Sequence, residues 1–297
     1  MPSVISTLMK AQISLLNPLL NNMDLETMRR LQDGLAALGA RVKAGQVVTC
    51  REDLGKCEAA WVFPLSGTVR KAILYLHGGA FTAGTLDYAQ GFGSMLALDT
   101  GRAALCLAYR LAPENPFPAA LDDAMAAYRF LLTRFKAEDT ALVGESAGGG
   151  LCFSLAMRIR DEGLPMPRQL VAISPWGDLS IRPEPDEKPE KDPVLSRASI
   201  AQSADMYLAG HPARDPYVSP VFGDFEGLPE SLIITGGDEI LLADTRRLAQ
   251  GLDQAGIPCM THVEEGMWHV YPLYPVPEAR EAQALARDFL DGKAAKP

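Results

Sequence analysis

Short apolar runs alternate with amphipathic stretches along most of the chain. The runs are nearly continuous, which is typical of strands covered on both faces rather than on one. Between them, apolar residues recur at helical spacing. This alternation predicts the α/β class, with a doubly wound and mostly parallel sheet. The predicted strands are 73–76, 104–109, 141–143, 170–173, 232–235 and 260–263, and the predicted helices are 119–135, 147–160, 242–255 and 278–290.

Two parts of the chain fall outside this alternation. Residues 4–20 have the spacing of an amphipathic helix and precede a predicted hairpin of 47–49 with 60–63. Residues 182–193 are charged and proline-rich, which predicts an exposed loop, and the helical pattern at 197–208 leads to no strand of its own. We therefore predict one α/β domain with a two-part helical lid, or cap. The lid comprises residues 1–46 and 182–227, and the α/β domain comprises 47–181 and 228–297.

Composition narrows the choice of partners. The 297 residues are 47% hydrophobic and 22% charged, as in ordinary globular proteins. Against 37 acidic residues there are 28 basic ones, and the net charge of -9 disfavours nucleic acid and anionic membranes as partners. No apolar run approaches the ~18 residues of a membrane span, and the N-terminus lacks the features of a secretory signal. The five cysteines include no CxxC pair, so no metal site or cofactor is predicted, and a cytoplasmic location fits best.

The strongest chemical signal is a serine between glycines, Gly144-Glu145-Ser146-Ala147-Gly148, which matches G-x-S-x-G. A predicted strand ends just before it and a predicted helix begins just after it, which is the context of a catalytic nucleophile. A serine at such a tight turn has a strained backbone, and small neighbours let strand and helix pass closely. Ser146 is therefore the predicted nucleophile, with an ordinary serine in a glycine-rich turn as the alternative.

A second glycine-rich loop, His-Gly-Gly-Ala at 77–80, follows the predicted strand 73–76. Acyl transfer needs N–H groups aimed at the carbonyl oxygen as it becomes an oxyanion. Successive glycines can turn their N–H groups inward, and Ala147, next to the serine, supplies another. The loop therefore predicts an oxyanion hole. We expect His77 itself to be buried and to shape this loop rather than to act as a base.

A serine nucleophile needs a base, and four histidines are available. In this fold class the catalytic order along the chain is serine, acid, histidine, which disfavours His77. His211 lies in the predicted insertion and His262 lies within a predicted strand. His269 lies in a loop just past a strand, where the sites of such sheets gather, and it is the predicted base.

The acid that orients the base should follow an earlier strand. Asp238 comes directly after strand 232–235 and two glycines, so it is the expected acid. Two alternatives remain open, because Glu239 is one residue further from the strand and Asp244 lies in the next helical pattern.

Four stretches together resemble the hormone-sensitive-lipase-like family of α/β-hydrolase esterases, and the resemblance runs from about Lys71 to the C-terminus. HGGAF at 77–81 is similar to the family's HGGG loop, and GESAGG at 144–149 is similar to its GDSAGG motif. YRLAPENPFPAA at 109–120 resembles the signature YRLAPEHPFPAA, and SPWGDLS at 174–180 resembles SPWxDLS.

The resemblance implies an α/β-hydrolase fold, a lid built from the same two segments, and no metal or organic cofactor. The catalytic residues that it implies are Ser146, Asp238 and His269. The oxyanion amides that it implies are those of Gly79, Ala80 and Ala147, with Gly78 as a lesser candidate.

Three positions depart from the family pattern. Ala80 replaces the third glycine, and its N–H remains a donor if the backbone angle suits a residue with a Cβ. Glu145 replaces an aspartate at the wildcard position of G-x-S-x-G, and Asn115 replaces a histidine in a loop. None of the three removes a catalytic group.

These observations predict a serine carboxylesterase that hydrolyses small to medium-chain acyl esters through an acyl-enzyme. One alternative is an amide or peptide-bond hydrolase on the same scaffold. Another is a non-catalytic ligand-binding protein, because the family includes a plant hormone receptor without the histidine base; the presence of His269 argues against it. The edge strands of such sheets also allow a homodimer.

Overall fold

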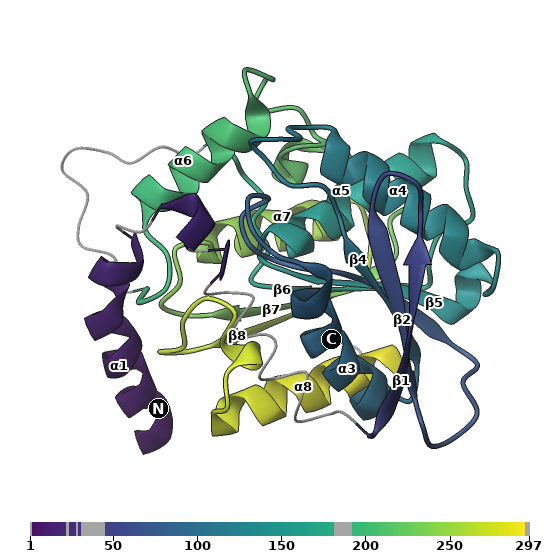
Figure 1. Cartoon of the computed structure of the whole chain (residues 1–297), viewed down its shortest axis with the longest axis horizontal. Coiled ribbons are helices and arrows are strands. Elements are labelled where there is room, and N and C mark those ends of the chain that lie inside the picture. The colour runs from purple at the N-terminus through teal and green to yellow at the C-terminus, as the bar shows by residue number, and fades with distance from the viewer. Residues whose placement is uncertain (1, 22–23, 28, 31–44, 181–191, 295–297) are drawn as a thin grey trace.

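The computed structural model describes residues 2–21, 24–27, 29–30, 45–180 and 192–294. Its strands form one eight-stranded sheet in the order β1-β2-β4-β3-β5-β6-β7-β8 (Figure 1). The pairs β1–β2 and β2–β4 are antiparallel, and every other pair is parallel. The strands are β1 (Val47–Asp53), β2 (Glu58–Pro64), β3 (Ala72–Leu76), β4 (Ala103–Ala108), β5 (Thr140–Glu145), β6 (Gln169–Ile173), β7 (Glu230–Gly236) and β8 (Cys259–Glu264). The predicted hairpin and the mostly parallel α/β sheet are both confirmed.

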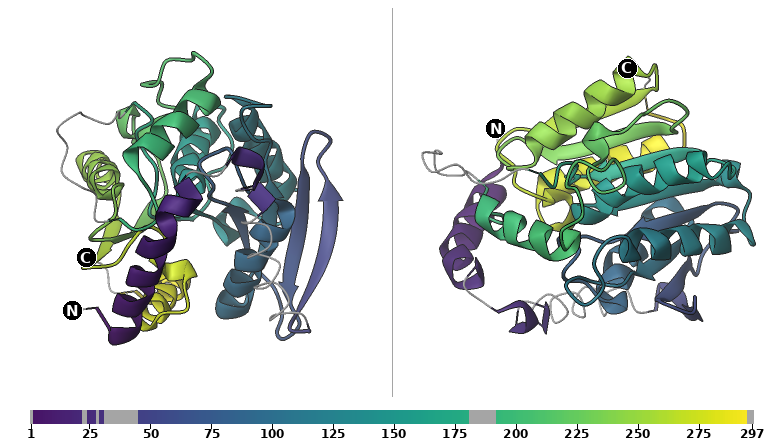
Figure 2. Two further views of the ribbon diagram at one scale, coloured as in Figure 1. Left: turned by 60° about the vertical axis from the view of Figure 1, so that its left-hand side comes forward. Right: turned by 90° about the horizontal axis from the view of Figure 1, so that it is seen from above.

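Helices cover both faces of the sheet (Figure 2). The first face carries α4 (Ala119–Leu132), α5 (Ala147–Asp161) and α7 (Leu242–Gln254), and the second carries α3 (Leu86–Thr100) and α8 (Pro277–Leu290). In the described ranges, three short 3₁₀ helices lie in connections: η1 (Ala137–Asp139), η2 (Pro220–Phe222) and η3 (Tyr271–Leu273).

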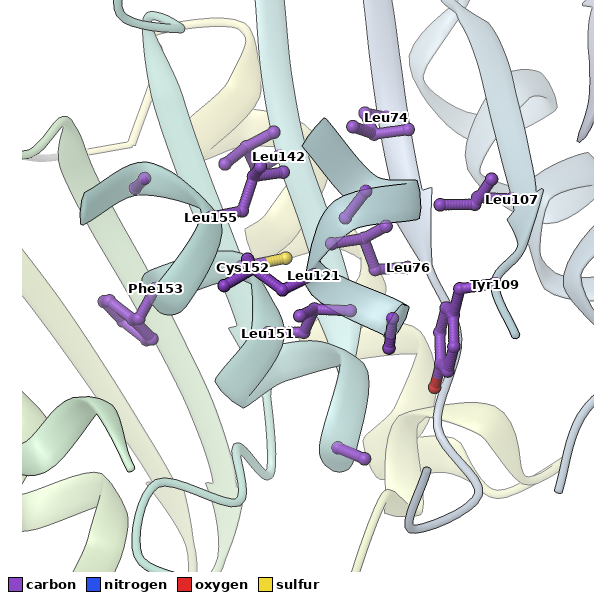
Figure 3. Close-up of a cluster of buried hydrophobic side chains, with 14 of the residues drawn as sticks. Leu74, Leu76, Leu107, Tyr109, Leu121, Leu142, Leu151, Cys152, Phe153 and Leu155 are labelled. Carbon is purple, nitrogen blue, oxygen red and sulfur yellow. The ribbon is translucent and has the colours of Figure 1, made fainter. Parts of the chain in front are cut away.

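The buried strands explain the continuous apolar runs in the sequence. On β3, Leu74 and Leu76 face the first layer and pack with Leu121 of α4 and Leu151 of α5 (Figure 3). Tyr75, between them, belongs instead to the core under α3 and α8. Because alternate side chains point to opposite faces, a strand covered on both sides must be apolar at every position.

Helix α3 was not predicted, because its glycines weaken the apolar pattern. One of them, Gly93, faces β4, where an added Cβ would lie 2.1 Å from Sγ of Cys106. The ends of the helix are well defined, since the side chain of Thr85 accepts from the N–H of Tyr88 and Gly101 takes a left-handed conformation with φ 65°. The close approach of α3 to the sheet thus requires glycine at position 93. The same glycine weakens the apolar pattern from which the helix could have been predicted.

Among the helices whose bounds are described, α1 (Val4–Asn21) and α6 (Arg197–Leu208) lie outside the layers (Figure 1). The start of α1 is attached to α8, because Glu278 accepts from the N–H of Ser3 and from the hydroxyl of Ser6, both at 2.5 Å. Helix α6 reaches the loop after β3, where Tyr207 stacks on Phe81 with ring centroids 3.9 Å apart. Most of the charged loop predicted at 182–193 lies outside the described residues. None of the helices in the described ranges is long and apolar enough to cross a membrane.

Candidate active site

Ser146 occupies the turn between β5 and α5. Its backbone has φ 55° and ψ −123°, a positive-φ conformation that costs a non-glycine residue about 1–3 kcal/mol. Two hydrogen bonds fix the turn: the N–H of Ser146 donates to the carbonyl of Ile173 (2.9 Å), and the N–H of Trp176 donates to the carbonyl of Ser146 (3.0 Å). The strained turn is the one that G-x-S-x-G predicts.

The glycines beside Ser146 are required by close contacts. A Cβ on Gly144 would lie 2.4 Å from the carbonyl oxygen of Gly148, and a Cβ on Gly148 would lie 2.0 Å from that of Leu76. Real Cβ atoms do not approach oxygen so closely. The glycines therefore let strand and helix pass closely, as predicted, and α5 starts against the ends of β3 and β5.

His269 lies in the connection from β8 to η3, with Nε2 2.8 Å from Oγ of Ser146. The imidazole is only 3% exposed, and this burial lowers the pKa of His269 to about 3. A neutral imidazole can accept the hydroxyl proton of Ser146 at Nε2, as a general base must. The structure thus brings together the predicted nucleophile and the predicted base.

The carboxylate that faces the other ring nitrogen of His269 belongs to Glu239. Its Oε2 lies 4.0 Å from Nδ1, a distance suited to an ion pair but too long for a hydrogen bond. Two glycines let the loops that carry these residues meet. A Cβ on Gly236 would lie 2.5 Å from the carbonyl oxygen of Met267, and one on Gly237 would lie 2.9 Å from Oε2 of Glu265.

Asp238, the expected acid, does not face His269. Its carboxylate forms an ion pair with Lys10 of α1, with 2.5 Å between Oδ2 and Nζ. Its N–H donates to the carbonyl of Met267 (2.9 Å), which fixes the backbone with the next residue, Glu239, turned toward the imidazole. The prediction for Asp238 is therefore corrected in favour of the neighbour that the sequence left open.

The other open alternative, Asp244, lies elsewhere. Its Oδ2 accepts from the N–H groups of Gly177 (2.8 Å) and Asp178 (3.0 Å), in the segment that follows β6. Burial raises the pKa of Asp244 to about 7. Asp244 thus fixes the SPWGDLS segment and is not a partner of the base.

Glu239 is buried among donors. Its Oε2 accepts from the hydroxyl of Ser174 (2.6 Å) and the N–H of Gly236 (3.1 Å), and its Oε1 accepts from the hydroxyl of Thr235 (2.5 Å). Burial raises the pKa of Glu239 to about 8, and these hydrogen bonds oppose the rise. Ser174 also accepts from the N–H of Val270 (3.0 Å), so one hydroxyl ties the carboxylate to the residue after the base.

The glycine-rich loop after β3 lies against the nucleophile, since a Cβ on Gly78 would be 3.1 Å from the Cβ of Ser146. The N–H of Gly78 donates to Oε1 of Glu145 at 2.5 Å, so this amide is already used, and its candidacy for an oxyanion hole is corrected. The backbone then turns left-handed at Gly79 (φ 110°), Ala80 (φ 53°) and Phe81 (φ 61°). The Cβ of Ala80 is thus accommodated at the price of strain.

Three amides of the predicted oxyanion hole have no backbone hydrogen-bond partner among the described residues, those of Gly79, Ala80 and Ala147. The amide of Ala147 lies at the start of α5, where helix N–H groups have no intrahelical acceptor. The aligned dipoles of the helix also favour negative charge there. These amides are therefore available to an incoming oxygen.

Glu145, at the wildcard position, was predicted only as a tolerated replacement. It is fully buried and also accepts from the hydroxyls of Tyr75 (2.6 Å) and Tyr88 (3.2 Å). Burial raises the pKa of Glu145 to about 7, and its three hydrogen-bond donors oppose the rise. The carboxylate thus connects the nucleophile turn to the loop after β3, a role that the sequence pattern alone did not reveal.

The remaining histidines have structural contacts. His77 is buried and stacks on Tyr109 with centroids 4.1 Å apart, and its Nδ1 donates to the carbonyl of Gly78 (2.6 Å). Burial lowers the pKa of His77 to about 4, so it shapes this loop as a neutral ring, as predicted. His211 pairs with Asp215 (2.7 Å), and Nε2 of His262 lies 3.3 Å from Glu264.

The N-terminal residues contact the loops of this site. Arg29 donates to the carbonyl of Thr82 (2.7 Å), in the loop after β3, and to the carbonyl of Ala112 (2.9 Å). The same guanidinium makes a two-pronged pair with Glu114, at 2.8 and 2.9 Å, which lowers the pKa of Glu114 to about 2. Together with the pair of Lys10 and Asp238, it ties the residues before β1 to opposite parts of the site.

Across the described ranges, no three histidine, cysteine, aspartate or glutamate side chains are grouped as a metal site requires. The reactive groups brought together are a serine, an imidazole and a carboxylate, beside amides for which the described ranges provide no backbone hydrogen-bond partner. A base within hydrogen-bond distance of a strained serine can generate an oxygen nucleophile. The amides can stabilise negative charge on an oxygen bound next to it.

Comparison with known proteins agrees with this arrangement. A family model of the alpha/beta hydrolase fold matches residues 73–273. An acetyl-hydrolase of Streptomyces hygroscopicus is 40% identical over 265 residues, which cover 88% of this chain and 86% of the relative. An esterase of Acinetobacter venetianus is 33% identical over 222 residues, 73% of each chain. The crystal structure of an esterase from the bacterial hormone-sensitive lipase family superposes with a TM-score of 0.88 at 30% identity, covering 99% of this chain and 100% of the other. The chain belongs to the hormone-sensitive-lipase-like family of α/β-hydrolase esterases.

Proposed function

We propose that this protein is a serine carboxylesterase that hydrolyses small to medium-chain acyl esters through an acyl-enzyme. The observation that carries the proposal is the distance of 2.8 Å between Oγ of Ser146 and Nε2 of His269, at a strained turn. Beside it lie three amides that have no backbone hydrogen-bond partner in the described part of the chain. The relative named acetyl-hydrolase supports a short acyl group.

In the first half of the reaction, Oγ of Ser146 attacks the ester carbonyl carbon while Nε2 of His269 takes the hydroxyl proton. The carbonyl oxygen becomes an oxyanion, which the amides of Gly79, Ala80 and Ala147 stabilise. The bond to the leaving alcohol then breaks, and Nε2 gives its proton to the alcohol oxygen. The acyl group remains on Ser146 as an ester.

In the second half, a water molecule gives a proton to Nε2 of His269 and attacks the acyl carbon. The same amides stabilise the second oxyanion. The bond between the carbon and Oγ of Ser146 breaks, Oγ recovers its proton, and the carboxylic acid leaves. Glu239 serves as the orienting acid: its carboxylate, 4.0 Å from Nδ1, favours the imidazole form with a proton on Nδ1 and stabilises the imidazolium that forms twice in the cycle.

We also propose that α1, the residues around Arg29 and α6 form a cap over the reacting groups. This assigns the N-terminal 46 residues and the insertion 182–227 to the cap. The contacts of Lys10, Arg29 and Tyr207 with loops at the carboxyl ends of the strands support it. The homodimer and the cytoplasmic location stay predictions from the sequence.

The substrate class can be tested with p-nitrophenyl acetate, butyrate, octanoate and laurate beside the matched p-nitroanilides. We expect kcat/KM to be highest for the short or medium esters and at least about 100-fold lower for the anilides, because an amine leaves less readily than an alcohol. Anilide turnover that rivals ester turnover would favour an amide hydrolase. A protein that binds these esters without turning any of them over would favour the ligand-binding alternative.

The pH dependence follows from the buried acid and base. The active form has Glu239 ionised and His269 neutral. Burial raises the pKa of Glu239 to about 8 and lowers that of His269 to about 3, so the proton that blocks activity leaves the pair near or just above neutrality. We expect kcat/KM to rise with pH from about 6 and to level off above about 9. The profile is best measured with p-nitrophenyl acetate at the isosbestic wavelength of the product; a flat profile from neutral to alkaline pH would contradict this assignment.

A further inference from the structure

Asp192 is the first described residue after the charged loop, in the part of the chain assigned above to the cap. Its carboxylate is buried, with only 5% of the residue exposed. Burying a carboxylate is costly unless donors surround it. The groups that donate hydrogen bonds to Asp192 therefore indicate which parts of the structure its carboxylate stabilises.

Two donors are local. Oδ1 of Asp192 accepts from the N–H groups of Val194 (2.9 Å) and Leu195 (3.4 Å), as an aspartate at the start of a turn commonly does. This turn precedes Ser196, which caps the N-terminus of α6. Local turn formation accounts for one oxygen of the carboxylate.

The other oxygen faces the catalytic loops. Oδ2 of Asp192 accepts from the N–H of Ile240 at 3.3 Å, the residue directly after Glu239. The backbone N–H of His269 belongs to the same surroundings: like those of Val194, Ile240 and Leu195, it opposes the rise in the pKa of Asp192 that burial causes. One buried side chain from the cap insertion thus accepts a hydrogen bond from the loop of Glu239 and lies near the backbone of His269, the partner of Glu239 in the acid–base pair.

We propose that Asp192 is a positioning residue of the catalytic pair, which holds the backbone of His269 and of the Glu239 loop in register and places a negative charge beside them. The proposal rests on the proposed esterase function. Because Asp192 comes from the insertion, the geometry of the pair depends on how that insertion is seated. Misplacement of a catalytic group by about 1 Å can cost a factor of about 10² in rate.

The charge has a separate, measurable effect. The ionisable groups around the site are Glu239 and His269 on the two loops, Tyr274 after η3, and the ion pair of Lys10 with Asp238 at α1. The negative charge of Asp192 raises the pKa of Glu239, although burial is the larger cause. Burial also raises the pKa of Asp192 to about 6, so Asp192 is ionised in the range where the pair loses its proton. Removing this charge should move the acid limb of the pH profile to lower pH.

Asp192→Asn tests both effects, because it keeps the size of the side chain and removes its charge. We expect kcat for p-nitrophenyl acetate to fall about 10- to 100-fold with little change in KM. We expect the acid limb of the kcat/KM profile to move down by about one pH unit. Asp215→Asn is the matched control, since Asp215 also accepts from a backbone N–H, that of Tyr217 (2.9 Å), and lies in the same insertion; its rate and profile should equal those of wild type.

Asp192→Ser separates positioning from local turn formation. Its hydroxyl can still accept from the nearby N–H groups of the turn, but it is too short to reach Ile240 and carries no charge. The proposal expects this variant to be slow with the same shift of the acid limb. Wild-type kinetics in either variant would overturn it, as would slow variants whose acid limb stays in place or a failure of both to fold. Failure of the proposed function would instead appear in the wild type, as absent ester turnover.

Discussion

Replacing Ser146 with alanine should abolish both ester turnover and labelling by a fluorophosphonate probe. The probe reacts by forming a bond from phosphorus to Oγ with loss of fluoride, so a protein without this oxygen cannot be labelled at this position. We expect kcat/KM for p-nitrophenyl butyrate to fall by at least about 10⁴-fold, because no other oxygen lies at hydrogen-bond distance from Nε2 of His269 among the described residues. The residual rate should come only from binding and from the amides that face the carbonyl oxygen.

The fold of the variant should be unchanged. Alanine adopts the φ of 55° at this turn no less readily than serine, and the two hydrogen bonds that fix the turn involve only the backbone. Ser154→Ala is a suitable control: Ser154 lies about two turns further along α5, and its hydroxyl donates to the carbonyl of Gly150 (3.4 Å) away from the imidazole. The control should label and turn over like wild type. Labelling or turnover that persists in Ser146→Ala would show that the nucleophile is elsewhere.

The fold and half of the site could be predicted because they rest on local chemistry. The doubly covered strands leave continuous apolar runs, and the turn at Ser146 demands glycines where a Cβ would lie within 2.4 Å of backbone oxygen. His269 could be selected among four histidines by its place after a strand. In each case the residues that reveal the strand, the turn or the base lie within a few positions of it in the sequence.

What could not be predicted depends on residues far apart in the sequence. Asp238 and Glu239 are neighbours, yet Asp238 pairs with Lys10, more than two hundred residues away, while Glu239 faces His269. The donors Thr235 and Ser174, which make a site for a glutamate, likewise come from the ends of two strands. The amide of Gly78 looked available until the structure showed its bond to Glu145. The distance in sequence from the end of a strand cannot distinguish Asp238 from Glu239, or the amide of Gly78 from those of the next two residues.

The adjacent carboxylates allow a sharp test of the acid. Glu239→Gln should lower kcat/KM by about 10³- to 10⁴-fold, because an amide cannot hold the Nδ1 proton or stabilise the imidazolium as a carboxylate does. The acid limb assigned to the pair should disappear with it. Asp238→Asn loses an ion pair whose side chains are 20% and 25% exposed, and such pairs contribute about 0.2–1 kcal/mol. Its kcat/KM should stay within about fivefold of wild type.

Thermal unfolding distinguishes a catalytic effect from a structural one. The amide oxygen of glutamine at position 239 can still accept from Ser174 and Gly236, and its NH2 group can donate to the hydroxyl oxygen of Thr235. The substitution also removes the cost of a buried charge, so the Tm of Glu239→Gln should equal or exceed that of wild type. A large loss of activity in a fully folded variant then belongs to the chemistry. If Asp238→Asn were instead the inactive variant and Glu239→Gln the active one, the acid would be Asp238, and α1 would have to release it from Lys10 before each turnover. The two variants, measured side by side with the same ester, decide between a carboxylate that orients the base and one that holds the cap.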